Sequence, residues 1–290
     1  MSYTIFTDAC SNLPNGTLSS LDIIPLPCSY TMDGVPGVYT GDLDNFDSHA
    51  FYDKLRAGSM LKTSLLNTQL FISHFAPELE KGLDIIYVGM SSGISGTIQA
   101  ARIAAEELSE QFPDRTVRVV DSLGAGFGPG LIACRASDLR SEGLCAKDAA
   151  DILDKEVTQL LQFFTVDDLN FLKRTGRVSG ATAAIGTMLN IKPLLWGDPT
   201  GHIVAYKKCR GRKKSVEAIL EQFRLKAVNV ENSRIAISHG DCPEEAQSLA
   251  EQVCAICKPK EFLIAPHEPF TGAHVGPGML ALFFFGEERK

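Results

Sequence analysis

The stretch from Gly89 to Thr97 holds the densest set of small polar residues that could bind a ligand. It reads Gly-Met-Ser-Ser-Gly-Ile-Ser-Gly-Thr. The apolar run before it predicts a buried strand over 84–90, and the residues after it predict a helix over 97–108. A turn between a strand and a helix brings hydroxyls close to helix-start amides that lack partners. Because the helix dipole is positive there, we expect this turn to bind an anion.

A second interpretation of the same stretch is a nucleophile. Residues 89–93 match the G-x-S-x-G elbow of serine hydrolases, which would make Ser91 the attacking group. A strand precedes the motif, as in those enzymes, but three residues separate it from the helix. The base would have to be one of three histidines: His239, His267 or His274.

A third interpretation is structural. Ser95 and Thr97 suit the cap of the following helix, since serine is a preferred N-cap residue. Thr63 and Ser64, in the loop over 62–67, are ordinary turn residues. From spacing alone, capping and anion binding both remain open for these side chains.

The first half of the chain alternates strands with helices, which indicates a mainly parallel sheet. Ligands bind such sheets beyond the carboxyl ends of the strands. Three polar turns share that end: Asp8–Ser11, Ser91–Thr97 and Asp121–Gly130. The alternating glycines of the last turn match neither G-x-G-x-x-G nor a P-loop, so tight packing explains them best. The predicted strands are 3–7, 84–90 and 116–120, with an extended stretch over 22–31 that prolines interrupt. The predicted helices are 46–56, 68–81, 97–108, one that follows the 121–130 turn and ends near 141, and 147–161.

The second half predicts a mixed sheet with helices on one face. We therefore expect two α/β domains, 1–160 and 161–290, the first with a mainly parallel sheet that has helices on both faces. The predicted strands are 162–166, 191–196, 202–207, 234–238, 262–265 and 279–285, and the predicted helices are 168–175, 215–226 and 244–257.

Composition narrows the function classes. The formal net charge is −7, which argues against nucleic acid as the main partner. No apolar run reaches the roughly 18 residues that a membrane span needs. The N-terminus turns polar too early for a signal peptide, so we expect a cytoplasmic protein.

Charged and metal-binding side chains give weaker signals. The dense basic run, 207–214, is a solvated turn or a docking patch. Arg174 and Arg177 are solvated or neutralise buried acids, and His274, in a glycine-rich loop over 272–278, reaches a pocket mouth or lies on the surface. The pair Cys254 and Cys257 has no second pair at zinc spacing, and no metal site is expected.

Eight separate segments, taken together and in order, resemble the DegV family of bacterial fatty-acid-binding proteins. Each segment is short, but together they span nearly the whole chain. They are Thr7-Asp8 with Ser11 and Leu13-Pro14, Lys62-Thr63-Ser64, Ser91–Thr97, Asp121-Ser122 with the glycines after it, Leu172–Arg177, Ile191-Lys192-Pro193, Arg210–Lys214, and His274–Gly278.

The resemblance implies a fatty acid, palmitate-like, buried between two domains. It implies that Thr63 and Ser95 hold the carboxylate and that Arg174 and His274 form a polar network near the opening. It also implies a carrier without catalysis or cofactor of its own, which presents the carboxylate to a partner kinase for acyl-phosphate formation. The full expected ligand-binding set is Thr63, Ser64, Ser95, Gly96, Thr97, Arg174 and His274.

Physical chemistry is compatible with that role. A carboxylate accepts several hydrogen bonds, so two hydroxyls and helix-start amides could satisfy it. The tail would contribute roughly 0.8 kcal/mol per buried CH₂. The expected kinase contact is the basic patch Arg210, Arg212, Lys213 and Lys214. The alternatives are a serine hydrolase that uses Ser91, a phosphate enzyme related by fold to dihydroxyacetone kinases, and a plain interaction module.

Overall fold

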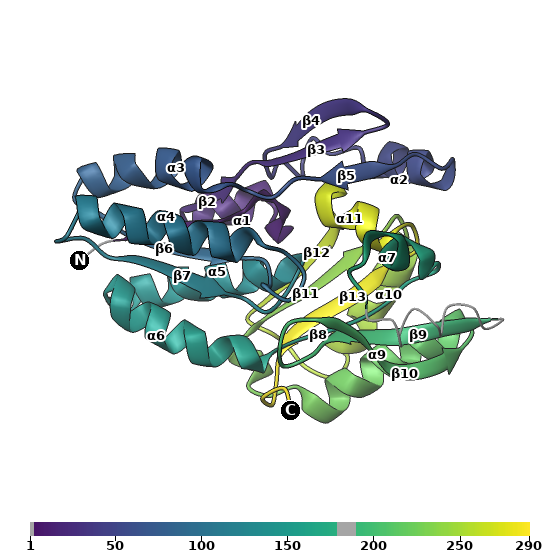
Figure 1. Cartoon of the computed structure of the whole chain (residues 1–290). Helices are drawn as coiled ribbons and strands as arrows, with labels where there is room; N and C mark the ends of the chain where they lie inside the picture. The colour runs from purple at the N-terminus through teal and green to yellow at the C-terminus, as the bar shows by residue number, and fades with distance from the viewer. Residues whose placement is uncertain (1–2, 179–189) are drawn as a thin grey trace. The chain divides into compact units, whose positions relative to one another are not determined.

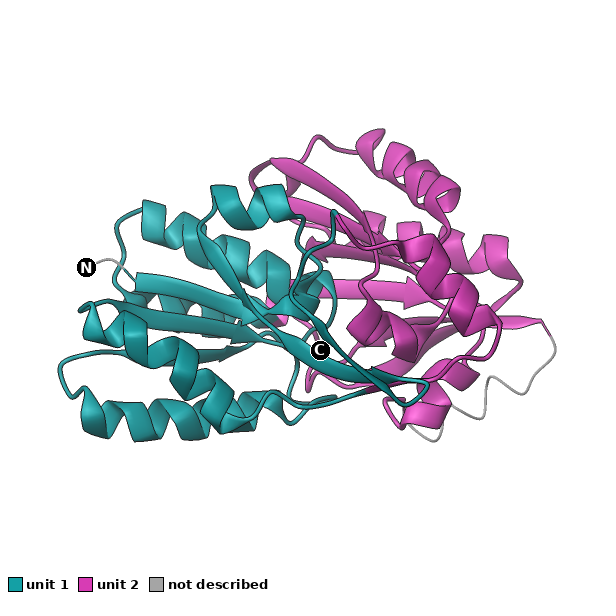
Figure 2. Ribbon diagram, turned by 90° about the horizontal axis from the view of Figure 1, so that it is seen from above, with its two compact units in different colours: residues 1–44, 63–157 teal, residues 45–62, 158–290 magenta. Residues whose placement is uncertain are grey.

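The computed structural model describes residues 3–178 and 190–290, which form two compact units. Unit 1 comprises Met1–Asp44 and Thr63–Val157, and unit 2 comprises Asn45–Lys62 and Thr158–Lys290 (Figure 2). The sequence predicts a single division near residue 160. The transfer of residues 45–62 to unit 2 has no counterpart in the sequence pattern.

Unit 1 is built around a four-stranded sheet in the order β2-β1-β6-β7. All three neighbouring pairs are parallel, which places the carboxyl ends of the strands at one edge. The central strands β1 and β6 are buried along their whole length, as expected for a parallel sheet covered on both faces. The strands are β1 (Tyr3–Asp8), β2 (Ile23–Leu26), β6 (Asp84–Gly89) and β7 (Val117–Asp121).

Helices cover both faces of this sheet, which confirms the predicted fold of the first half. Figure 1 shows α3 and α4 on one face and α5 and α6 on the other. α4 buries Ile98, Ala101, Ala104 and Leu108, which form one stripe of the helix. The helices are α1 (Asn15–Ser20), α3 (Thr68–Glu80), α4 (Thr97–Gln111), α5 (Phe127–Ser141) and α6 (Ala146–Glu156).

Two features of unit 1 position the segments near the strand ends. Gly130 lets α5 approach the 3-10 helix η1 (Ala9–Ser11), because a Cβ there would lie 2.5 Å from the Ser11 carbonyl oxygen. The strands β3 (Cys28–Met32) and β4 (Val35–Tyr39) form an antiparallel hairpin. β5 (Leu61–Thr63) enters unit 1 at its last residue, and the next amide, of Ser64, donates to the Ser29 carbonyl over 3.0 Å.

Unit 2 contains the predicted mixed sheet, with six strands in the order β10-β9-β8-β13-β11-β12. β11 and β12 run parallel, and the other neighbouring pairs run antiparallel. The strands are β8 (Leu160–Thr165), β9 (Ile191–Gly197), β10 (Ile203–Arg210), β11 (Arg234–His239), β12 (Glu261–Pro266) and β13 (Leu280–Phe285).

The longer helices of unit 2 pack against one face of this sheet, over a core that includes Phe163, Phe223 and Phe284. Two short helices, α7 and α11, contact each other, and α2 packs against the rest of unit 2 through the fully buried Tyr52. The helices are α2 (Ser48–Arg56), α7 (Asn170–Thr175), α9 (Arg212–Lys226), α10 (Pro243–Cys254) and α11 (Pro269–Val275), with 3-10 turns η2 (Val157–Gln159) and η3 (Val230–Asn232).

Three local predictions are wrong. Lys62 and Thr63 are not loop residues, because β5 runs through them and ends at Thr63. His274 does not lie in a loop, because α11 runs through it to Val275 and the glycine that follows, Gly276, caps the helix with a φ of 77°. The basic run is not a turn either, since it ends β10, passes Gly211 and begins α9. Among the described helices, none is long and apolar enough to cross a bilayer.

Candidate functional site

Ser91 lies inside the turn after β6 and has a structural role there. Its side chain is fully buried, and its hydroxyl accepts the Gly93 amide over 3.0 Å. Its carbonyl accepts the amides of Ile94 and Ser95 over 3.2 and 3.1 Å. The one histidine in the unit 1 sequence, His74, has its ring nitrogen 2.9 Å from the Leu70 carbonyl in α3. This geometry favours a structural role for Ser91, which stabilises the turn. It does not favour a nucleophile that uses a base within unit 1.

Ser95 and Thr97 are paired with each other at the start of α4. The Ser95 hydroxyl donates to the Thr97 Oγ1 over 3.0 Å and accepts the Thr97 amide over 3.3 Å. The N-cap residue itself is Gly96, which has no side chain to offer. Local capping is therefore real, and it is carried out by the residue before the N-cap. The Ser95 residue as a whole is half-buried.

The segment that contains Thr63, the last residue of β5, and Ser64 lies next to this turn. A Cβ placed on Gly96 would meet the Leu65 Cδ1 at 3.3 Å, so the Leu65 side chain sits directly over the turn. Leu65 is nonetheless 59 % exposed, and Ser64 is exposed beside it. The structure thus brings together the two unit 1 segments that the sequence singled out, and an exposed apolar side chain lies between them.

Two carboxylates hold the turn at the ends of the neighbouring strands. Asp8, at the end of β1, accepts the Tyr87 hydroxyl over 2.5 Å and the Met90 amide over 2.8 Å. Burial raises the pKa of Asp8 to about 6, although both hydrogen bonds oppose that shift. Asp121, at the end of β7, accepts the Ser92 amide over 3.2 Å.

This anchoring corrects part of the anion hypothesis. The amides of Met90 and Ser92 are already bonded to carboxylates, so they cannot form an anion cradle. What remains for a ligand is the later part of the turn, Ser95 to Thr97, and the loop beside it. The sequence places Asp8 and Asp121 in the right turns, but nothing in their spacing shows which amides they accept.

The expected cations and histidine come together in unit 2. The Arg174 guanidinium carbon lies 4.2 Å from the centre of the Phe171 ring, which covers one of its faces. Burial first, and then the charges of Arg177 and Arg174, lower the pKa of His274 to about 4, so its imidazole is neutral at pH 7. Phe171 is the residue that sequence reasoning missed. Its ring lies 2.5 Å from where a Cβ of Gly276 would be, which seats α7 against the end of α11.

The basic patch is smaller than the sequence suggests. Arg212 is ion-paired with Glu245 at 2.5 Å and lies near Asp167 at 3.7 Å, so its charge is already neutralised. Lys213 and Lys214 are exposed in the first turn of α9, where the helix dipole disfavours cations, and Arg210 is exposed at the end of β10. The usable patch therefore consists of Arg210, Lys213 and Lys214.

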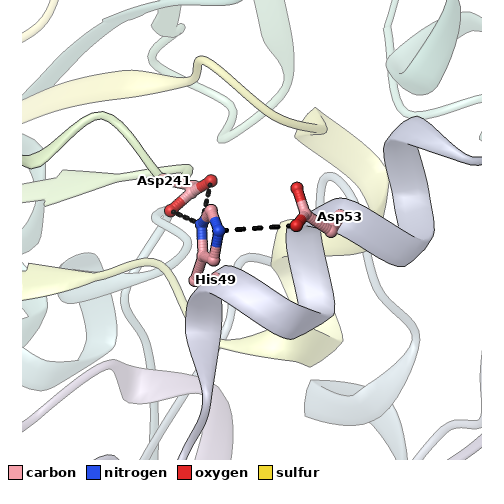
Figure 3. A group of neighbouring side chains, drawn as sticks. All are labelled: His49, Asp53 and Asp241. Carbon is pink, nitrogen blue, oxygen red and sulfur yellow. Dashed lines mark hydrogen bonds and ion pairs between the residues drawn. The ribbon is translucent and has the colours of Figure 1, made fainter.

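His49, Asp53 and Asp241 form a cluster that the sequence does not reveal, because Asp241 is far from α2 along the chain. Figure 3 shows the His49 ring between the two carboxylates, and their ligand atoms lie within 4.8 Å of one another. The ring uses both nitrogens, Nδ1 at 3.1 Å from Asp241 and Nε2 at 3.4 Å from Asp53. These contacts raise the pKa of His49.

A fourth side chain, Arg56, shows whether this cluster is a metal site or an ion-pair network. The Arg56 guanidinium lies 2.6 Å from Asp241 and 2.8 Å from Asp53. The two carboxylates are thus already paired with the chain's own cations. A metal ion would have to displace Arg56 and turn the His49 ring, so the arrangement favours an ion-pair network that ties α2 to the loop after β11.

Cys254 and Cys257 are free thiols at the end of α10. Burial raises the pKa of Cys257, and its Sγ lies 3.7 Å from the Val253 carbonyl, to which it donates. A thiol in that state is a poor nucleophile and a poor metal ligand. Cys257 therefore has the features of helix-end packing, whereas Cys254 is exposed at the last residue of the helix.

Comparison with known proteins places the whole chain in one family. The DegV family model, described as one of uncharacterised proteins, matches residues 2–287. A DegV domain-containing protein of Clostridium perfringens is 36 % identical over 99 % of both chains. The structure of a DegV family protein from Thermus thermophilus, described by its fatty acid binding, has a TM-score of 0.88 and 30 % identity and covers 99 % of this chain and 100 % of its own.

A second solved structure agrees. DegV of Bacillus subtilis, described as a fatty acid binding protein, has a TM-score of 0.84 and 28 % identity, and the match covers 99 % of this chain and 100 % of that one. These similarities extend over full lengths and include the sheets that position the turn after β6. The chain described here belongs to the DegV family.

Proposed function

We propose that this protein binds a long-chain fatty acid such as palmitate and holds its carboxylate with Ser95 and Thr63. The observation that carries the proposal is the meeting of the Thr63–Ser64 segment with the Ser95–Thr97 turn in unit 1, joined by Leu65 over Gly96. Relatives of 30 % and 28 % identity that are described as binding fatty acids support it.

The hydroxyls of Ser95 and Thr97 at the start of α4 can provide a hydrogen-bond donor to a ligand while they stay hydrogen-bonded to each other. At present Ser95 donates to Thr97. A hydroxyl has one donor and two acceptor positions, and its hydrogen rotates freely. When a carboxylate arrives, Thr97 can donate to Ser95, and the Ser95 hydrogen is then available to the ligand. Ser64, Gly96 and the start of the α4 dipole complete this half of the proposed site.

Unit 2 contributes the other proposed contacts, Arg174 and His274. A neutral His274 can donate a hydrogen bond without bringing a second charge, and Arg174 adds the positive charge that a carboxylate needs. We propose a long apolar slot for the tail, as the family resemblance implies. Each buried CH₂ would contribute roughly 0.8 kcal/mol, so the tail supplies most of the affinity and the head group sets its position.

We further propose that the protein has no catalysis of its own and presents the carboxylate to a kinase. The exposed cations Arg210, Lys213 and Lys214 are suited to an acidic partner surface on an otherwise acidic chain. The sequence suggested that Arg212 is part of this patch. Because Arg212 is ion-paired with Glu245, we assign it a structural role instead.

Lipid extraction and native mass spectrometry of the purified protein test the binding proposal. We expect a co-purified acyl chain, or uptake of added palmitate. Ser95→Ala should weaken palmitate binding by about 1–3 kcal/mol, the usual effect of removing a partner of a charged group. Ser109→Ala, at the exposed far end of the same helix, is the matched control and should change nothing.

Three outcomes would contradict the proposal in whole or in part. Protein that carries no acyl chain and takes up no palmitate would exclude a fatty-acid carrier. Labelling of Ser91 by a fluorophosphonate probe, with esterase activity that Ser91→Ala abolishes, would favour the serine hydrolase instead. Unchanged palmitate affinity in Ser95→Ala would leave Ser95 as a cap only.

A further inference from the structure

Four polar side chains form a continuous buried relay in unit 2. The His267 Nδ1 lies 2.9 Å from the Ser238 Oγ, and its Nε2 lies 2.8 Å from the Thr271 Oγ1. The Thr271 hydroxyl in turn bonds to the Glu268 carboxylate. Ser238 and Glu268 are fully buried, and the other two side chains are at most 6 % exposed. None of them belongs to the ligand-binding set expected from the sequence.

The relay has one internally consistent direction. Glu268 accepts the amides of Phe270 and Thr271 over 2.5 and 2.8 Å, one on each carboxyl oxygen, an arrangement that favours the ionised, acceptor-only form. Thr271 therefore donates its hydrogen to Glu268, and its oxygen accepts from Nε2–H of His267. Burial, with a smaller contribution from His239, lowers the pKa of His267 to about 3, so the ring is neutral. Its Nδ1 is then the acceptor, and the hydroxyl of Ser238 donates to it.

The relay fixes the start of α11. Glu268 is the N-cap of this helix, and Thr271 lies in its first turn. The carbonyl of His267 also accepts the Tyr52 hydroxyl over 2.9 Å. Gly272 lets Tyr52 approach, because a Cβ there would lie 2.6 Å from the tyrosine oxygen. α11 has only seven residues, too few to be stable without such external contacts.

His274 lies one turn after Thr271 on this short helix. Residues three apart lie on the same side of a helix, so whatever rotates or shifts Thr271 moves His274 with it. At the far end, Gly276 seats the helix against Phe171, the ring that also covers Arg174. The place of the His274 imidazole beside Arg174 and Arg177 therefore depends on how α11 is held at its start.

We propose that the relay of Ser238, His267, Thr271 and Glu268 is the positioning element for His274. The part of this inference that concerns ligand affinity rests on the fatty-acid site proposed above, whereas the part that concerns His274 itself does not.

The same four residues also resemble a serine nucleophile with an oriented base. One feature decides against catalysis by Ser238. Its bond to His267, whose ring is held by Thr271, is the bond a nucleophile makes to its base, but the Ser238 side chain has no exposed surface for a substrate to reach. The relay therefore makes a rigid support, and labelling of Ser238 by a fluorophosphonate probe would overturn this assignment.

Nitrogen NMR of histidine-labelled protein tests the direction of the relay in the unmodified chain. The sequence has six histidines, so the spectrum is tractable. We expect His267 to remain neutral from pH 7 to pH 5, with its hydrogen on Nε2 and a bare Nδ1. A hydrogen on Nδ1, or a charged ring in that range, would overturn the relay as described.

Thr271→Val tests the positioning, because it keeps the shape of the side chain and removes only the hydroxyl. We expect the pKa of His274 to rise from about 4 toward its ordinary value of 6.5 and palmitate affinity to fall about tenfold, while Thr271→Ser restores both. Thr158→Val, whose exposed hydroxyl contacts Glu288, is the matched control in the same unit. The thermal midpoint of every variant is measured alongside.

The outcomes separate this inference from the fatty-acid proposal. A lower thermal midpoint in Thr271→Val with an unchanged His274 pKa and unchanged affinity would mean a merely structural relay, and would refute the inference. If Thr271→Ser fails to restore the His274 pKa, the hydroxyl is not what positions α11. If Thr271→Val shifts the His274 pKa but the wild-type protein binds no palmitate, the positioning stands and the fatty-acid proposal fails.

Discussion

Asp8 offers a direct test of how the turn after β6 is held. Its carboxyl group is fully buried. It accepts hydrogen bonds from the Tyr87 hydroxyl and the Met90 amide, and no cation contributes to the shift of its pKa. Burial raises its pKa from 3.8 to about 6. The ionised form is thus less stable in the folded protein than in the unfolded chain. Asp8→Asn removes the charge and keeps the shape, and its amide oxygen can still accept from Met90.

The magnitude follows from linkage. A pKa that rises by about two units corresponds to roughly 3 kcal/mol between the two protonation states. Because the folded pKa is the higher one, the folded protein holds more protons between pH 4 and pH 6, and stability falls as the pH rises through that window. Below pH 4 the favourable contribution of a protonated Asp8 is fully present, and above pH 6 it is lost. The pH dependence of Asp8→Asn should lack this step.

Denaturant unfolding at pH values from 4 to 7.5 measures the effect. Unit 1 has no tryptophan, since Trp196 belongs to unit 2, so backbone circular dichroism should be followed beside fluorescence. We expect the free energy of unfolding of Asp8→Asn, relative to wild type, to rise by up to about 3 kcal/mol between pH 4 and pH 7. Asp114→Asn, at an exposed position, is the control. A difference between wild type and Asp8→Asn that stays flat with pH would refute the reasoning.

Three further predictions concern packing and surface. Gly276→Ala should lower the free energy of unfolding by about 2 kcal/mol or more in denaturant melts, because its φ is 77° and the new methyl group would meet the Phe171 ring; an unchanged melt would contradict that contact. Leu65→Asp should weaken palmitate binding in a displacement titration, since it places a negative charge beside the Ser95–Thr97 turn, and equal affinity would remove Leu65 from the site. Reversing Lys213 and Lys214 to Glu should leave palmitate affinity unchanged and slow acyl-phosphate formation by a partner kinase, and an unaltered rate would exclude this patch.

The parallel sheet of unit 1 could be predicted because its signals are local. Apolar runs of strand length alternate with helical stripes, and both follow from backbone periodicity. The turn over 91–97 could also be predicted, because a run of small polar residues separates a strand from a helix there, although the sequence left its role open. The segments carrying Thr63 and Ser95 do lie together in unit 1, although only the family resemblance had paired them.

Other parts of the candidate site could not be predicted, because they depend on groups far apart in the chain. The alternating glycines around His274 suggested a loop, yet Glu268 caps a helix there and Tyr52, more than two hundred residues away, holds its first turn. Arg212 looked like one more free cation until the fold placed Glu245 beside it. Phe171 had no motif at all.

The sequence by itself determined the family, most of the strands and helices, and the turns where chemistry could take place, because these depend on neighbouring residues and on short motifs in order. The tertiary structure decided which hydrogen-bonding groups remain available. In the folded chain the amides of Met90 and Ser92 are bonded to carboxylates. Ser95 is instead paired with the Thr97 hydroxyl, which can rotate. Hydrogen bonds act over about 3 Å, and only the folded chain brings such distances about between strands distant in sequence.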